Sequence, residues 1–235
     1  MNKLIRFAMA AGVLLALVFM VSCSSDDEQA GISYGTLPYG GKDYKTVQIG
    51  NQTWMAENLN YAGGDGSLGV CYDDDEGNCE IYGRLYDWEA AMQACPSGWR
   101  LSSNADWHEL IGYVEGNLNN CKDYDEDDVD GGYCFMTGTK LLSQSGWRED
   151  EDYVWSAVSG TDDYGFSALP GGSGSSGYFD AAGRLGYWWS SDEFDSDRAY
   201  LWDMGYGGGG YGGYITWSDT YKMRLSSVRC VKEGL

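Results

Sequence analysis

Residues 87–114 read DWEAAMQACPSGWRLSSNADWHELIGYV, and this stretch predicts two amphipathic helices joined by a proline turn. Asp87 can cap the first helix, which Pro96 and Gly98 then end. The second helix starts after residues 103–106, which resemble a capping box. In both helices, apolar residues recur at the i, i+3, i+4 and i+7 spacing of one buried face. The two apolar faces consist of Trp88, Ala91, Met92 and Cys95, and of Trp107, Leu110, Ile111 and Val114.

Sequences typical of strands flank these helices on both sides. Residues 44–49 and 52–55 predict a hairpin around a Gly50-Asn51 turn. Beyond about residue 115 there is no long helical period, and short aromatic segments alternate with glycine. These patterns predict an α+β domain in which two helices are followed by a mainly antiparallel sheet with long loops.

The charge balance and the single histidine restrict the partners and the chemistry. The chain has 235 residues, with 15 Lys+Arg against 36 Asp+Glu and a net charge of -21, so it repels the phosphates of nucleic acids. Sites that need two or three imidazoles cannot be built from His108 alone. His108 lies off the apolar face of its helix, and we expect it to be a solvated surface residue.

The N-terminus indicates export and lipid anchoring. Residues 1–22 combine a basic start with an apolar run that is too short to span a bilayer, which predicts a signal peptide. Residues 20–23 (MVSC) resemble the bacterial lipobox, in which Cys23 becomes the lipidated first residue. The alternative is an ordinary cleaved signal with Cys23 in a disulfide.

The segment after Cys23 is acidic and glycine-rich, and we assign residues 23–40 to a linker. Its first residues, CSSDDE, resemble the acidic tag of some surface lipoproteins of Gram-negative bacteria. A solvated charged spacer is an equal alternative. We therefore expect a lipid-anchored protein of the outer membrane or cell surface of a Gram-negative bacterium, whose membrane contact is the lipid.

Six cysteines remain once Cys23 is set aside, and an even number in an exported chain implies disulfides. Fifteen connectivities are formally possible. Spacing favours two local pairs around acidic loops, and the third pair then joins an early helix to the last strand. The expected pairs are Cys71 with Cys79, Cys121 with Cys134, and Cys95 with Cys230.

Six ordered motifs closely resemble those of the Fibrobacter succinogenes major paralogous domain family. They are YKTVQIGNQTWMAENLN (44–60), YGRLYDW (82–88), ACPSGWRL (94–101), DDYGFSALPGG (162–172), YWWSS (187–191) and SVRCV (227–231). The resemblance implies a domain over residues 41–233 with an acidic insertion at 115–135. It also implies a C-type-lectin-like fold with a twisted sheet, in which Cys95 bridges to Cys230.

One acidic loop between two cysteines is a candidate calcium site, because hard carboxylate oxygens at alternating spacing suit Ca²⁺. A Thr stands at position 137, where an EF-hand loop in this register needs Glu, so the loop is not an EF-hand. The alternative is a solvated acidic loop without a cofactor. The candidate ligands are Asp123, Asp125, Asp127, Asp128 and Asp130.

Aromatic residues in a glycine-rich stretch are the candidate ligand-binding residues. Rigid amphipathic rings give a large contact area at low entropic cost, and Tyr and Trp also stack on sugar rings. The alternative is that these rings fold back onto the domain's own sheet. The candidates are Trp202, Tyr206, Tyr211, Tyr214 and Trp217.

We find no catalytic motif in the sequence and expect a protein that is not an enzyme. The formylglycine-generating enzymes share the broad fold but need a reactive cysteine pair, and here all six cysteines are expected in disulfides. The expected function is that of a cell-envelope lipoprotein whose lectin-like domain binds a polysaccharide or a surface protein. A structural envelope protein is the second hypothesis, and an enzyme of the formylglycine-generating-like fold is the third.

Overall fold

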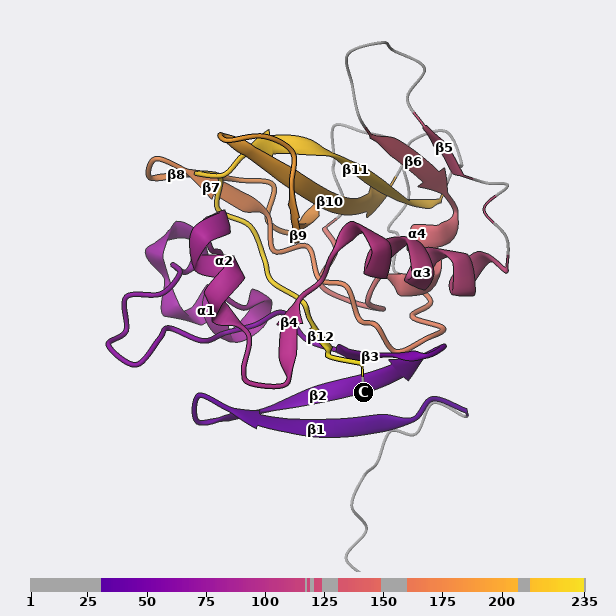
Figure 1. Ribbon diagram of the computed structural model, residues 1–235, viewed down its shortest axis with the longest axis horizontal. Coiled ribbons are helices and arrows are strands. Elements are labelled where there is room, and N and C mark those ends of the chain that lie inside the picture. The colour runs from indigo at the N-terminus through magenta and orange to yellow at the C-terminus, as the bar shows by residue number, and fades with distance from the viewer. Residues whose placement is uncertain are drawn as a thin grey trace, which may run out of the picture.

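The computed structural model describes residues 31–116, 118, 121–123, 131–148, 160–206 and 212–234 (Figure 1). Two five-stranded sheets and one hairpin form its framework. The first sheet has the order β1 (Tyr34–Tyr39), β2 (Lys42–Ile49), β3 (Gln52–Met55), β12 (Cys230–Lys232), β4 (Trp99–Leu101). The second has the order β5 (Cys121–Asp123), β6 (Gly132–Phe135), β11 (Gly213–Tyr221), β10 (Arg198–Tyr206), β9 (Gly186–Glu193). The hairpin pairs β7 (Ser173–Ser175) with β8 (Tyr178–Asp180).

In the described part of the chain, four short α-helices and one 3-10 turn connect these strands. Figure 1 shows α2 and α3 between the first sheet at the bottom and the second sheet at the top. None of the helices in the described ranges has the length and apolar character needed to cross a membrane. The helical elements are η1 (Tyr72–Asp74), α1 (Glu76–Tyr82), α2 (Trp88–Ala94), α3 (Asn104–Glu115) and α4 (Thr137–Leu141).

The helix starts and the hairpin predicted from the sequence are confirmed. The Asp87 side chain accepts a hydrogen bond from the Ala90 amide and caps α2. Ser103 and Asp106 form a reciprocal capping box at the start of α3. The hairpin of β2 and β3 also forms, with Ile49 opposite Gln52. Each of these features depends on residues close together in the sequence.

The expected fold class is wrong. Three strands precede the first helix, four short α-helices stand in place of two, and the strands divide into two large sheets and a hairpin. The described residues are mostly β and do not show the layout of two helices followed by one twisted sheet that defines the expected C-type-lectin-like domain.

The physical reasons for this correction lie in three short segments. Helices α1 (EGNCEIY) and α4 (TGTKL) carry no apolar stripe at helical spacing, so sequence periodicity does not predict them. Strand β1 (YGTLPY) lies inside the range assigned to the linker, because Gly35 and Pro38 indicate loop rather than strand. It nevertheless pairs with β2 along its whole length, from Tyr34 opposite Val47 to Tyr39 opposite Lys42.

Three disulfides tie the fold together, and all three expected pairs are confirmed. Cys71 bonds Cys79, and Cys121 bonds Cys134 across β5 and β6. Cys95, which follows α2, bonds Cys230 of β12 and closes a loop with a sequence separation of 135. This disulfide joins the last strand, β12, to the end of α2.

The buried residues form two clusters. The first contains Trp54, Trp107, Trp188 and Trp202 and lies where α3 packs between the two sheets. The second contains residues of α2 together with Trp189 and Leu201 of the second sheet. The strands β9 and β10 contribute to both clusters, so parts of each face of the second sheet are covered.

Candidate functional site

The second sheet has one face on the core and one face that remains partly exposed. Residues directly opposite each other in an antiparallel pair point to the same side, so the strand register sorts the side chains. Trp188, Trp202, Trp217 and Gly132 form one row, and the three tryptophans belong to the first buried cluster.

The neighbouring row lies on the opposite face and crosses all five strands. It consists of Lys122, Tyr133, Thr216, Asp203 and Tyr187. Lys122 is exposed and the other four are half-buried. With Phe135 and Tyr214 of the next row, these residues define what we call the open face.

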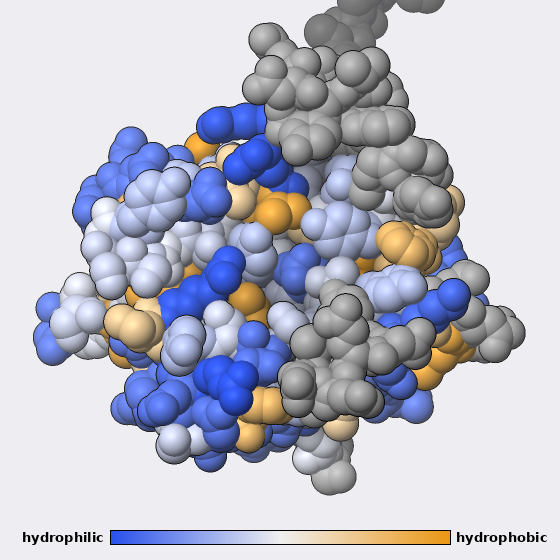
Figure 2. Space-filling view, turned by 90° about the horizontal axis from the view of Figure 1, so that it is seen from above, coloured by the Kyte–Doolittle hydropathy of each residue, from blue (hydrophilic) through white to orange (hydrophobic). Residues whose placement is uncertain are grey.

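Figure 2 views the molecule from the side on which the second sheet lies in Figure 1. Where side chains are coloured, hydrophobic residues occur in separated spots between pale and hydrophilic ones. The coloured part of this surface therefore mixes hydrophobic and hydrophilic residues rather than forming one continuous apolar patch.

Two of the aromatic residues predicted to bind a ligand are core residues instead. Trp202 is 0% and Trp217 is 7% exposed. Their rings stack on each other at 5.0 Å, and Trp202 stacks on Trp107 of α3 at 5.6 Å. The prediction is wrong for this pair, because strand register turns both rings toward α3.

The other three candidates are distributed differently. Tyr206 is half-buried, packs against the first cluster and meets Trp147 edge-on at 5.7 Å. Tyr211 lies outside the described residues. Of the described candidates, only Tyr214 lies on the open face, opposite Phe135 and Gly205.

Asp203 is the ionisable centre of the open face. Burial raises the pKa of its carboxyl group to about 6, while the charge of Arg224 and the hydrogen bond from Thr216 oppose this rise. The Thr216 hydroxyl donates to Asp203 Oδ1 at 2.5 Å. Asp203 Oδ2 receives no hydrogen bond from the described residues, so this oxygen is an available acceptor.

Arg224 borders Asp203 without forming an ion pair with it among the described residues. Its guanidinium lies over the ring of Tyr187 at 4.4 Å, and its Nη2 donates to the Ser173 hydroxyl at 2.8 Å. Its Nε is buried and has no hydrogen-bond partner in the described part of the chain. We call Asp203, Thr216, Tyr187, Arg224 and Ser173 the polar half of the open face.

The aromatic half of the open face consists of Tyr133, Phe135 and Tyr214. The rings of Tyr133 and Phe135 lie 4.8 Å apart, and Phe135 is 36% exposed. A Cβ atom at Gly205 would lie 3.0 Å from the Tyr214 hydroxyl oxygen and 2.4 Å from Leu185 Cδ2. A glycine at this position thus gives the Tyr214 side chain room across the neighbouring strand.

Four of the five candidate calcium ligands lie outside the residues that the structure describes. Asp123 ends β5 and is exposed. Asp125, Asp127, Asp128 and Asp130 are not among the described residues. Calcium binding by this loop therefore stays a prediction.

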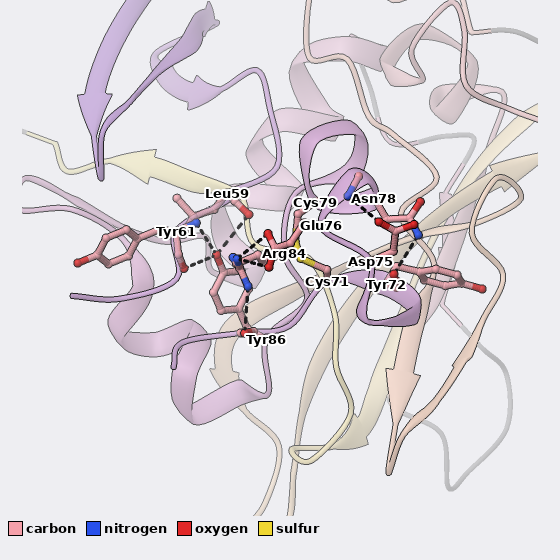
Figure 3. The surroundings of a disulfide bond; sticks show 12 residues. Leu59, Tyr61, Cys71, Tyr72, Asp75, Glu76, Asn78, Cys79, Arg84 and Tyr86 are labelled. Carbon is pink, nitrogen blue, oxygen red and sulfur yellow. Dashed lines mark hydrogen bonds and ion pairs between the residues drawn. A yellow bond between two sulfur atoms is a disulfide. The ribbon is translucent and has the colours of Figure 1, made fainter. Parts of the chain in front are cut away.

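A different group, around the first disulfide, brings metal-binding residue types together. Cys71, Glu76 and Cys79 place three possible ligand atoms within 4.8 Å of one another. The two sulfurs are bonded to each other, so they are not thiolate ligands (Figure 3). Both Glu76 oxygens accept from Arg84 Nη2 at 3.2 Å, and Asp75 caps α1 by accepting from the Gly77 amide. This group is structural.

The sequence does contain a signal for the open face, although the prediction of an aromatic binding stretch did not rest on it. Along β11, Tyr214, Thr216 and Ser218 alternate with the apolar residues Ile215 and Trp217. Such alternation predicts a strand with one buried and one wet side. Asp203 and Tyr187 are visible only through the pairing of β10 with its neighbours, which depends on residues far apart in the sequence.

Residues of the six family motifs surround a buried arginine, Arg229, and do not gather at the open face. Arg229 is 0% exposed, and its Nε donates to Asn58 Oδ1 at 2.8 Å. Its other nitrogens donate to the carbonyl oxygens of Met55, Phe166 and Ser167. Four of the six motifs thus meet here, counting Trp188, whose Nε1 also donates to Asn58 Oδ1 at 2.8 Å.

Comparison with known families agrees with these motifs. A family model described as the Fibrobacter succinogenes major domain matches residues 47–232. The chain belongs to this family. No curated protein and no solved structure matches the chain. In this Fibrobacter succinogenes major domain, residues of the matched motifs form buried contacts of the fold and lie largely apart from the open face.

Proposed function

We propose that this protein is a lipid-anchored, non-catalytic protein of the cell envelope whose open face binds a neutral polysaccharide. The observation that carries the proposal is the pair Asp203 and Arg224. These oppositely charged groups are partly buried and near each other, yet each keeps a hydrogen-bonding atom without a partner in the described residues. Because unsatisfied buried polar groups cost free energy, their presence favours a binding role.

The chemistry of the face fits a polyhydroxyl ligand. An open carboxylate oxygen accepts from hydroxyl groups, and the guanidinium of Arg224 donates to them. Tyr133, Phe135 and Tyr214 add apolar rings, which suit the apolar faces of sugars. The net charge of -21 disfavours polyanions, so a neutral glycan is the class that the protein tolerates best.

The cysteines support a non-catalytic role. All six cysteines of the domain are in disulfides, so the pair of thiols that a formylglycine-generating enzyme needs does not form here. The group around Asp203 then serves recognition, in which a fixed carboxylate and guanidinium orient hydroxyl groups.

Binding is tested with the full-length protein, purified in detergent, against xylan, mannan, mixed-linkage β-glucan and the polyanion alginate. We expect capture by at least one neutral polymer and none by alginate. Asp203→Asn and Arg224→Gln should each weaken that capture at least tenfold, because each removes a charged hydrogen-bonding group. Asp43→Asn is the matched control, since Asp43 is exposed on β2 of the other sheet.

Two outcomes contradict the proposal. If none of the neutral polymers is captured, the structural role becomes the better hypothesis. If capture persists unchanged in both variants, the open face is not the binding site. Circular dichroism of each variant separates lost binding from lost folding.

The anchor is tested separately, because Cys23 and the signal lie outside the described residues. Cys23→Ala should move the protein from the membrane fraction to the soluble fraction, since the lipobox cysteine carries the proposed lipid. Ser24→Ala is the control and should stay with the membrane. A Cys23→Ala protein that still sediments with membranes overturns the lipid anchor.

A further inference from the structure

The two halves of the open face lie on different strands, and their separation carries information about ligand size. Tyr133 is on β6 and Tyr187 is on β9, with β11 and β10 between them. Three strand spacings amount to about 14 Å. A single sugar ring is little wider than one such spacing, so one monosaccharide does not reach both halves.

The second buried cluster covers the open face at one side and so limits the direction in which a ligand can lie. Along the strands the next row of the same face contains Ser218 of β11, Leu201 of β10 and Trp189 of β9. Leu201 is 4% and Trp189 is 0% exposed, because the second buried cluster covers them. The partly exposed row therefore runs across the strands, from Lys122 on β5 to Tyr187 on β9, where Tyr187 packs against the second cluster.

The chemistry changes along this row. At the β9 and β10 end, Asp203 offers an open carboxylate oxygen, and the charged guanidinium of Arg224 lies beside it over the Tyr187 ring. At the β6 end, Tyr133 and Phe135 offer paired rings, with Tyr214 beside them. A ligand that satisfies both ends needs hydroxyl groups at one end and an apolar ring face at the other.

We propose that the open face binds an extended segment of at least three sugar rings that lies across β6, β11, β10 and β9. The polar half holds one end of the segment by hydrogen bonds, and the aromatic half stacks on the ring at the other end. This inference rests on the proposed function and adds the length and the orientation of the ligand. The neutral charge of the ligand follows from the same acidic balance as before.

The test is a length series of xylo-, manno- and gluco-oligosaccharides, from one to six units, titrated into the full-length protein by calorimetry. We expect affinity to rise at least tenfold between two and four units and to level off beyond. Tyr133→Ala should weaken the tetrasaccharide at least fivefold and leave the disaccharide unchanged. Asp203→Asn should weaken both, since the polar half binds the short ligand as well.

Tyr221→Ala is the matched control, because Tyr221 is 64% exposed at the far end of β11, across from Arg198. It should bind every length like the wild type. Affinity that is the same for two and four units, or a Tyr133→Ala variant with full tetrasaccharide affinity, overturns the extended segment while the proposed function stands. No binding at any length or to the parent polymers overturns the proposed function itself.

Discussion

Arg229 and Asn58 are 171 positions apart in the chain and are joined by a 2.8 Å hydrogen bond in the core. Asn58 also accepts from Trp188 and donates through Nδ2 to the Tyr82 carbonyl oxygen and the Ser227 hydroxyl. One amide thus links four segments that the sequence separates widely. We conclude that these residues of the matched motifs hold the core of this chain together.

Replacing Asn58 by Ala should lower the free energy of unfolding by about 3–5 kcal/mol, because it leaves two buried donors, Arg229 Nε and Trp188 Nε1, without an acceptor. Urea denaturation followed by tryptophan fluorescence measures this loss. Asn51→Ala is the control, since Asn51 is exposed in the β2–β3 turn, and it should stay within about 0.5 kcal/mol of wild type. Equal stability of the two variants contradicts the assigned role of Asn58.

Local signals in the sequence predict local structure correctly. Asp87 and the capping box at Ser103 mark the starts of α2 and α3, and the Gly50-Asn51 turn marks the β2–β3 hairpin. Cysteine spacing gives the short disulfides, and elimination gives the long one. Each of these inferences uses residues whose interaction does not depend on the rest of the fold.

The open face could not be predicted in the same way. Whether Trp202 or Asp203 of β10 points outward depends on which side of the strand α3 covers, and that is a tertiary fact. Tyrosine and tryptophan suit both a core and a wet surface, so residue type does not decide the question. The sequence predicted aromatic ligand binding in this region, and the register places Tyr214 on the open face and Trp202 and Trp217 in the core.

Asp203 should make the stability of the protein depend on pH. Its folded pKa is about 6 against an ordinary value of 3.8, because burial disfavours the charged form. The stabilising contribution of the protonated carboxyl is therefore complete below about pH 3.8 and is lost as the pH rises through about 6. Asp203→Asn removes this loss and should be more stable than wild type at pH 7.5 by up to about 3 kcal/mol, and similar at pH 4.

Urea denaturation of both proteins at pH 4, 5, 6 and 7.5 checks this expectation, with Asp43→Asn as the charge-matched control. A variant that is more stable yet binds glycan more weakly is the signature of a residue kept for function. A pH-independent difference between Asp203→Asn and wild type contradicts the raised pKa.

The two disulfides of unequal loop length should differ in their contributions to stability. Cys95 and Cys230 close a loop with a separation of 135, and Cys71 and Cys79 one with a separation of 8. In the chain-entropy description these loops contribute about 5 and about 2.5 kcal/mol. The double variant Cys95→Ala with Cys230→Ala should therefore unfold at lower urea than Cys71→Ala with Cys79→Ala. Equal midpoints would show that the long bridge does not constrain the unfolded chain.

The ring of His108 packs against the stacked tryptophan rings of Trp107, Trp202 and Trp217, which we call the tryptophan stack. Its ring meets Trp202 and Trp217 edge-on, at 5.0 and 5.1 Å, although the residue as a whole is exposed as expected. Desolvation by this packing lowers the pKa of His108 below 6.5, and the charge of Asp123 opposes the shift only in part. The neutral imidazole is thus favoured by folding, so its contribution is present above pH 6.5 and is lost as the pH falls toward the lower folded pKa.

Because His108 is the single histidine of the chain, its C–H resonances can be followed by NMR from pH 4.5 to 8 without assignment. We expect a midpoint below that of the same protein unfolded in urea. Trp217→Leu should raise the midpoint toward 6.5, because it removes one of the two rings that exclude water from the imidazole. Tyr221→Ala, further along β11, should leave it unchanged. A folded midpoint at or above the unfolded one would mean that the imidazole is hydrated and that it does not pack on the stack.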